Sequence, residues 1–209
     1  MTESDRKRGL ILDGAIKRFS HFGINKTTMA EIAEDLSVTK PALYYYFPDK
    51  QSIIVAVADK IIKEYLENFI EAFEKHQNTE DALLSLIDLR RHFSEKYFML
   101  HIGEEYTDSY LRDPALMQVV QKTKVKEVEV IASSFQSAIN KGEFSNMDTT
   151  KTAELFIDTL NGIAVCMKMG KISIPDADTF ELLSNKQKDV ARIFLNGLKN
   201  HSNGRTDIK

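Results

Sequence analysis

The stretch that decides the fold runs from residue 27 to residue 50 and reads T-T-M-A-E-I-A-E-D-L-S-V-T-K-P-A-L-Y-Y-Y-F-P-D-K. Thr28 and Glu31 have the T-x-x-E spacing of a capping box, in which the two residues hydrogen-bond each other at the start of a helix. Apolar residues at the helical repeat continue as far as Leu36. The first half of the stretch therefore predicts a short helix of about eight residues that begins at Thr28.

A second short helix follows after a connection of only two residues, Ser37 and Val38. Thr39 is a good N-cap residue, and Pro41 lies in the first turn, where its missing N–H costs nothing. The helix is predicted to end near Phe47. Two short helices joined by a tight turn form a helix-turn-helix, and the second helix of this motif enters the major groove of DNA.

The second helix is predicted to have an apolar face and a DNA-facing face. Leu43 and Phe47 lie four residues apart and form the apolar face. Their expected partners are Ile32, Leu36 and Val38. The residues left for DNA are Thr39, Lys40, Pro41, Ala42, Tyr44 and Tyr45. Because a helix cannot bury three consecutive tyrosines on one face, at least one of those at 44–46 is expected to point outward.

Residues 27–50 resemble the DNA-binding signature of the tetracycline-repressor (TetR/AcrR) family, which reads roughly T-[TV]-x-x-I-A-x-x-x-G-V-[ST]-x-x-[TA]-L-Y-x-[HY]-F-x-x-K. The resemblance implies an all-α fold of nine helices. It places a helix-turn-helix DNA-binding domain over residues 5–60, with the motif at 28–47. A helical effector-binding and dimerisation body follows over residues 61–201. It also implies a dimeric repressor that a small ligand releases from a palindromic operator.

The resemblance assigns DNA-binding roles by position. Thr28 matches a threonine that meets a phosphate at a helix N-terminus. Tyr44 matches a tyrosine that contacts backbone and bases, and Lys50 a lysine that pairs with phosphate. The full predicted set is Thr28, Thr39, Lys40, Pro41, Ala42, Tyr44, Tyr45, Tyr46 and Lys50. Tyr46 stands where His is commonest. Ser37 departs from the usual glycine and, if its φ is positive, costs about 1 kcal/mol relative to glycine.

Composition excludes several classes of protein. The formal net charge is −3, so the chain is not a globally basic nucleic-acid binder, and residues 1–50 carry eight Lys or Arg against seven acids. The single Cys166 excludes an internal disulfide and a cysteine-based zinc site within one chain. With no signal peptide and no long apolar run, a cytoplasmic location is expected. The basic run 6–8 is either a solvated terminus or a phosphate contact.

Apolar residues at the helical repeat from Leu12 to Phe22 predict a first helix, and Gly23 is expected to end it. Helix start and stop signals continue along the chain. They predict helices from residue 50 to about 76, from 79 to about 93 and from 96 to 111. Later helices begin at Asp113-Pro114, Asp148 and Pro175-Asp176, and glycines at 142 and 170 end the first two of these. The first five residues and the last eight are expected to fray.

Aromatic residues recur through the helices of the body, and two interpretations stay open. In one, an apolar or aromatic small molecule binds a cavity there. Its expected lining residues are Tyr97, His101, Tyr106 and Phe135. In the other, the body binds a protein partner. His101 and Glu105 have a spacing compatible with a metal, but ordinary surface charges explain them better. No enzyme motif is present in the sequence, so neither a cofactor nor an enzymatic activity is expected.

A dimer is expected because one helix-turn-helix makes too few base contacts for a rare site. Strong apolar stripes remain in the predicted helices 148–169 and 178–199, which are expected to pair with their twofold mates. The expected contacts are Ala153, Ile157, Ala164, Val190, Phe194 and Leu198. Cys166 lies among small and apolar residues and is expected to be a buried structural thiol.

Overall fold

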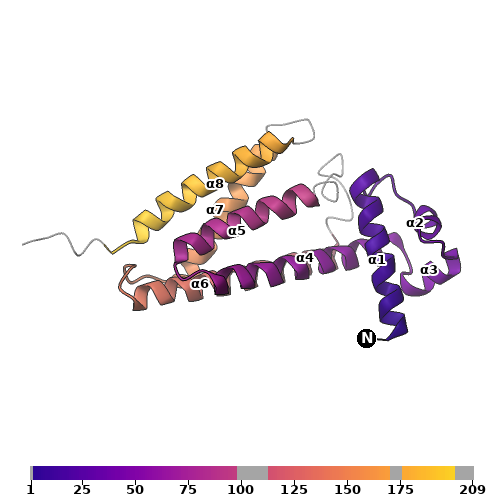
Figure 1. Cartoon of the computed structure of the whole chain (residues 1–209), viewed down its shortest axis with the longest axis horizontal. Helices are drawn as coiled ribbons and strands as arrows, with labels where there is room; N and C mark the ends of the chain where they lie inside the picture. Colours follow the sequence, from indigo (N-terminus) through magenta and orange to yellow (C-terminus); the bar gives the residue numbers. More distant parts are fainter. Residues whose placement is uncertain (1, 98–112, 170–175, 201–209) are drawn as a thin grey trace, which may run out of the picture. The chain divides into compact units, whose positions relative to one another are not determined.

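The computed structural model describes residues 2–97, 113–169 and 176–200, and within these ranges it contains α-helices and no strand (Figure 1). The helices are α1 Glu3–Phe22, α2 Met29–Asp35, α3 Lys40–Tyr46, α4 Lys50–Lys75, α5 Thr79–Lys96, α6 Pro114–Asn140, α7 Thr149–Met169 and α8 Ala177–Leu198. The all-α prediction is confirmed. The described ranges hold eight helices rather than the expected nine, and the helix expected over 96–111 falls largely outside them.

Local capping explains the boundaries of the two short helices. The Thr28 hydroxyl accepts from the backbone N–H of Glu31 at 3.3 Å, and the Thr28 N–H donates to the Glu31 carboxylate at 2.8 Å. Both bonds of the predicted capping box are therefore formed. The Thr39 hydroxyl accepts from the N–H of Ala42 at 3.3 Å and so caps α3, as expected.

The prediction of a frayed N-terminus was wrong, because α1 begins at Glu3. A capping box forms there too: Thr2 accepts from the N–H of Asp5 at 3.1 Å and donates its own N–H to the Asp5 carboxylate at 2.9 Å. The other end of α1 is the predicted glycine stop. Gly23 has a φ of 80°, a conformation that favours glycine, and its N–H donates to the carbonyl of Phe19.

The chain divides into two compact units, Met1–Glu64 with Lys96–Lys122 and Tyr65–Glu95 with Thr123–Lys209. In the first unit, α2 packs against both α1 and α3. A close approach explains Gly14 in α1: a Cβ there would lie 2.6 Å from a methyl carbon of Leu36. The buried core of this unit includes Ile11, Leu12, Ala15, Phe19, Met29, Ile32, Leu43, Phe47 and Ile53.

The second unit has its own apolar core, built from α5, α6, α7, α8 and the second half of α4. Its buried members include Phe69, Leu83, Leu86, Ile87, Ile131, Phe135, Phe156, Ile157, Leu160 and Leu195. α7 and α8 lie side by side (Figure 1). Within the described residues, none of the helices is both long enough and apolar enough to span a membrane.

Several residues expected at a dimer contact face the core of their own chain instead. Ala153 and Ile157 are completely buried, and Phe194 and Leu198 pack against the same core, with the Phe194 ring 5.3 Å from that of Phe156. Cys166 is exposed, so the prediction of a buried thiol was also wrong. The apolar stripe of α7 is wider than the surface that one neighbouring helix can cover. The helical periodicity of the sequence therefore did not show which edge of the stripe α8 covers.

Candidate nucleic-acid interface

Helix α3 has one face anchored in the core and the other exposed. Leu43 is fully buried and Phe47 is 2% exposed, as expected for the inner face. On the outer side Tyr44 is 48% exposed and Tyr45 is 82% exposed, which confirms that the three tyrosines do not share one buried face. Thr39, Lys40, Pro41 and Ala42 are also exposed, and Tyr46 is half-buried.

The turn between α2 and α3 is tight and includes a strained residue. Ser37 has a φ of 52°. In this conformation serine is less stable than glycine by about 1 kcal/mol. Backbone bonds close the turn, since the N–H of Ser37 donates to Glu34 and that of Val38 donates to Ala33, each at 3.0 Å. Val38 is 36% exposed, so its expected place on the inner face was wrong.

Thr28 is exposed, and its hydroxyl takes part in the capping box. It donates to the Glu31 carboxylate at 2.8 Å while accepting from the Glu31 N–H. The pKa of Glu31 is lowered by the backbone N–H and hydroxyl of Thr28, and further by the charge of Arg18. The Glu31 carboxylate therefore remains ionised at the N-terminus of α2, where the helix dipole also favours a negative charge.

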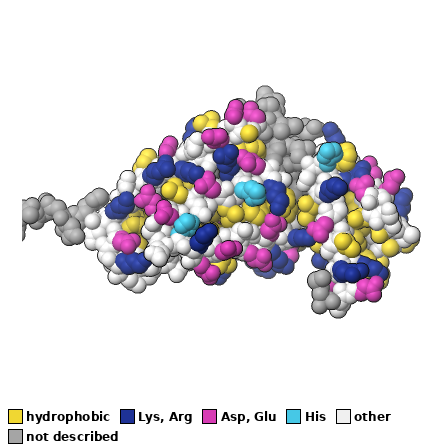
Figure 2. Space-filling view, in the orientation of Figure 1, with side chains coloured by type: hydrophobic (Ala, Val, Ile, Leu, Met, Phe, Trp, Pro, Cys, Tyr) yellow, Lys and Arg dark blue, Asp and Glu magenta, His cyan; other side chains and the backbone are white. Residues whose placement is uncertain are grey.

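Basic side chains lie near the C-terminal end of α3. The guanidinium of Arg8 lies over the ring of Phe47 at 5.0 Å from its centre. Lys7 pairs with Glu3 at 3.1 Å, and Arg6, Lys7 and Arg8 are all exposed. Across the face shown in Figure 2, basic and acidic side chains are interspersed. Any attraction of this surface for DNA would therefore depend on the local placement of basic side chains, as the net charge of −3 predicts.

Sequence reasoning missed a contact that braces α2. Arg18 on α1 donates two hydrogen bonds to Asp35, at 2.8 and 2.7 Å, and pairs with Glu31 at 2.9 Å. The partners are 13 and 17 positions away in the sequence, and no local motif connects them. Only the packing of α1 against α2 brings the three side chains together.

The residues predicted to line an effector cavity are not gathered by the described structure. Tyr97 belongs to the first unit, where its buried hydroxyl donates to Glu64 at 3.0 Å. Phe135 is fully buried in the core of the second unit. His101 and Tyr106, like the metal-compatible Glu105, lie outside the described residues.

A polar cluster connects four helices inside the second unit. Tyr65 on α4 donates its hydroxyl to Glu127 on α6, and Arg90 on α5 lies 3.5 Å from the same carboxylate oxygen. Arg90 also donates to the side-chain carbonyl of Asn161 on α7. The Glu127 side chain is only 8% exposed. Burial raises the pKa of Tyr65 well above its usual value, and the negative charge of Glu127 adds to this, so Tyr65 remains a donor.

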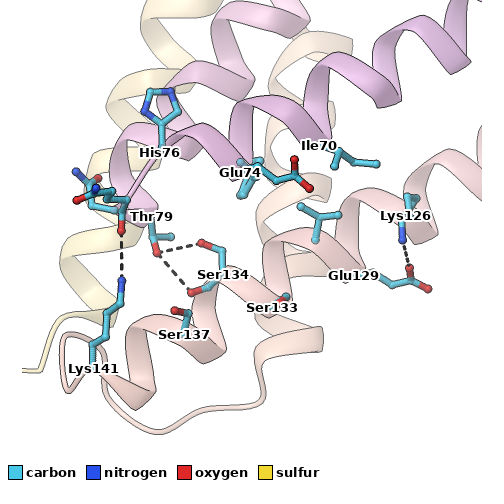
Figure 3. A pocket seen from close by; sticks show the side chains of 14 residues that line it. Ile70, Glu74, His76, Thr79, Lys126, Glu129, Ser133, Ser134, Ser137 and Lys141 are labelled. Atoms are coloured by element: carbon cyan, nitrogen blue, oxygen red, sulfur yellow. Dashed lines mark hydrogen bonds and ion pairs between the residues drawn. The ribbon is translucent and has the colours of Figure 1, made fainter.

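The second unit also has an open cleft of about 520 Å³, between the end of α4 and α6 (Figure 3). Thr79 contacts Ser134 at 3.1 Å in its floor, Lys141 donates to the backbone carbonyl of Gln77, and further serines and acids line it. This polar cleft differs from the apolar cavity that the sequence predicts. Neither Tyr97 nor Phe135 lines it.

Comparison with known proteins agrees with this arrangement. The sequence-family model of bacterial regulatory proteins of the tetR family matches residues 11–57. The uncharacterized HTH-type transcriptional regulator YhgD of Bacillus subtilis is 29% identical over 71% of this chain and 77% of its own length. The crystal structure of a transcriptional regulator from Cytophaga hutchinsonii is 30% identical and matches with a TM-score of 0.83, over 93% of this chain and 99% of that one.

The fold recurs at lower identity in the regulator FadR of Bacillus subtilis, whose structure is in complex with stearoyl-CoA. That chain is 16% identical and matches with a TM-score of 0.65, over 87% of this chain and 96% of its own. The helix-turn-helix of α2 and α3, the matched family model and the full-length structural similarity lead to one conclusion. The chain belongs to the TetR family of helix-turn-helix transcriptional regulators.

Proposed function

We propose that this regulator is a homodimeric repressor that binds a palindromic operator and is released from it by a small molecule. The observation that carries the DNA-binding part is the exposed face of α3. Tyr44 and Tyr45 point away from a core that fixes Leu43 and Phe47. An α3 anchored on one side and exposed on the other has the geometry of a helix that reads the major groove.

The proposed contacts divide into two kinds. Thr39, Lys40, Pro41, Ala42 and the exposed tyrosines of α3 face the bases and the adjoining backbone. Thr28 caps the N-terminus of α2, and Lys50 is the first residue of α4. Both are proposed to contact phosphates, and Tyr46 is proposed to lie at the edge of this surface. Phosphate contacts release counterions, so affinity is expected to fall steeply with salt.

Replacing Tyr44 or Lys50 with alanine is expected to weaken DNA binding by about 1–3 kcal/mol without unfolding the protein. The measurement is fluorescence anisotropy with a duplex that the wild-type protein selects from a random library, repeated at several salt concentrations. Lys63→Ala is the matched control, because Lys63 is an exposed α4 lysine paired with Asp59. Full binding by both variants, or affinity independent of salt, would show that this surface does not bind DNA.

The proposed homodimer rests on apolar side chains that a single chain leaves exposed. Leu155 and Val165 on α7 are 59% and 48% exposed, and Leu182 and Ile193 on α8 are 47% and 72% exposed. Gly162 also lies on the exposed side of α7, and a Cβ there would meet nothing of its own chain. A twofold pairing of α7 and α8 in a four-helix bundle would bury this surface.

The proposed effector is an apolar or aromatic molecule held within the second unit. Stearoyl-CoA bound to the B. subtilis FadR supports an apolar ligand for this fold. A ligand site needs a few fixed polar groups among apolar walls, and the cluster of Tyr65, Arg90, Glu127 and Asn161 lies beside the Phe69 and Phe93 rings. A body that binds a protein partner instead is not favoured by the comparisons.

A compound that acts as effector is expected to bind the free protein about 5–150-fold more tightly than the DNA complex, a coupling of about 1–3 kcal/mol. Since α4 runs through both units, a ligand that displaces its second half can change the separation of the two α3 helices in a dimer. The measurement is calorimetric titration of acyl and aromatic compounds into the free protein and into its complex with the selected duplex. Equal affinity for both forms would contradict ligand-induced release.

A further inference from the structure

An arginine and two carboxylates form a clamp between α1 and α2. The side chain of Arg18 is only 14% exposed, whereas those of Glu31 and Asp35 are 37% and 45% exposed. Both nitrogens at the end of the guanidinium are engaged: one donates to both oxygens of Asp35, and the other lies 2.9 Å from Glu31. The guanidinium also lies 4.8 Å from the centre of the Phe22 ring. Arg18 is therefore held in one orientation by contacts on several sides.

The clamp reaches a residue of the proposed DNA interface. One oxygen of Glu31 pairs with Arg18, and the other accepts from both the N–H and the hydroxyl of Thr28, each at 2.8 Å. A hydrogen-bonded chain thus connects Arg18 through Glu31 to Thr28. Asp35 lies one turn further along the same helix and contacts the same guanidinium.

We infer that Arg18 is a positioning residue for DNA binding, which acts through Glu31 and Asp35 by neutralising their carboxylates beside Thr28. The inference rests on the proposed DNA-binding function. An ionised carboxylate touching Thr28 repels a phosphate that approaches Thr28, because the distance is within the Debye length of about 10 Å at 0.1 M salt. A guanidinium always carries a positive charge, and its planar set of donors can pair with two carboxylates at once. The ammonium group of a lysine lacks this planar geometry.

A clamp that only braced α2 mechanically would give the same hydrogen bonds, so the test has to separate charge from bracing. If charge matters, removing Arg18 harms DNA binding only while the two carboxylates remain. If bracing alone matters, removing the carboxylates as well gives no recovery. Glu31→Gln suits this comparison, because glutamine also forms the capping box, and Asp35→Asn keeps the shape of the side chain.

Arg18→Gln is expected to lower affinity for the selected duplex about tenfold at 0.1 M salt. The affinity of Arg18→Lys is expected to lie between those of Arg18→Gln and the wild-type protein. The triple variant Arg18→Gln/Glu31→Gln/Asp35→Asn is expected to return to within about twofold of wild type. The measurement is fluorescence anisotropy between about 0.05 and 0.3 M salt, with thermal unfolding of each variant followed by circular dichroism.

Two controls separate a local effect from a change in net charge. Arg18→Gln/Asp59→Asn/Glu67→Gln has the same net charge as the triple variant, but it neutralises carboxylates on α4. Its affinity for the selected duplex is expected to stay as low as that of Arg18→Gln. Arg91→Gln breaks the exposed Arg91–Glu95 pair of α5, and it is expected to bind as wild type does.

Wild-type affinity for Arg18→Gln would overturn the inference. So would equal weakness of Arg18→Gln and the triple variant in folded protein, because that result assigns Arg18 a bracing role alone. Both outcomes leave the proposed function intact, since the wild-type protein still binds its duplex. If the wild-type protein enriches no duplex at all, the proposed function fails and the inference fails with it.

Discussion

Replacing Ile193 with glutamate is expected to convert the protein to a monomer and to abolish tight operator binding. Ile193 is 72% exposed in the single chain, on the side of α8 that also carries Leu182. Burying one isoleucine contributes about 1.5–3 kcal/mol, and twofold symmetry doubles the effect. The substitution therefore weakens the proposed dimer by about 3–6 kcal/mol, before the cost of burying two glutamates is counted.

Analytical ultracentrifugation measures the oligomeric state, and fluorescence anisotropy with the selected duplex measures DNA affinity. Because a monomer occupies one half-site at a time, affinity is expected to fall at least about 100-fold. Val125→Glu is the matched control, since Val125 is an exposed residue of α6, 49% accessible, outside the proposed interface. A dimeric Ile193→Glu protein with normal operator binding would place the interface elsewhere.

Replacing Arg90 with methionine is expected to lower the free energy of unfolding by about 3 kcal/mol. The change leaves the Glu127 carboxylate, which is 8% exposed, without the positive charge beside it. Breaking a buried pair by removing one partner costs about 3–5 kcal/mol, and the lower end applies because Arg90 itself is 20% exposed. The side-chain carbonyl of Asn161 loses its donor as well.

Chemical denaturation of the purified protein measures this effect. Arg91→Met is the matched control, because Arg91 is the next residue on α5 and pairs with Glu95 at the surface; its expected effect is below about 1 kcal/mol. Arg90→Met combined with Glu127→Met is expected to recover part of the loss, since the uncompensated charge is then gone. Equal stability of Arg90→Met and wild type would mean that solvent already screens this cluster.

The helix-turn-helix and most helix boundaries were predictable because they depend on neighbours in the sequence. A capping box involves residues three positions apart, as at Thr28 and Glu31, and a glycine stop such as Gly23 acts on the preceding turn. The sequence left open whether Ser37 has a positive φ, and the structure shows a φ of 52°. The exposure of Tyr44 and Tyr45 followed from the geometry of one helix.

Only the tertiary structure decided which residues far apart in the sequence meet. Periodicity marked an apolar stripe on α7, yet Ile157 faces the core while Leu155 and Val165 remain exposed, because the position of α8 selects the buried edge. The partners of Arg18 depend on how α1 crosses α2, and the polar cluster around Glu127 needs four helices at once. Such contacts are set by packing between helices, and the short-range signals that begin and end a helix contain no information about them.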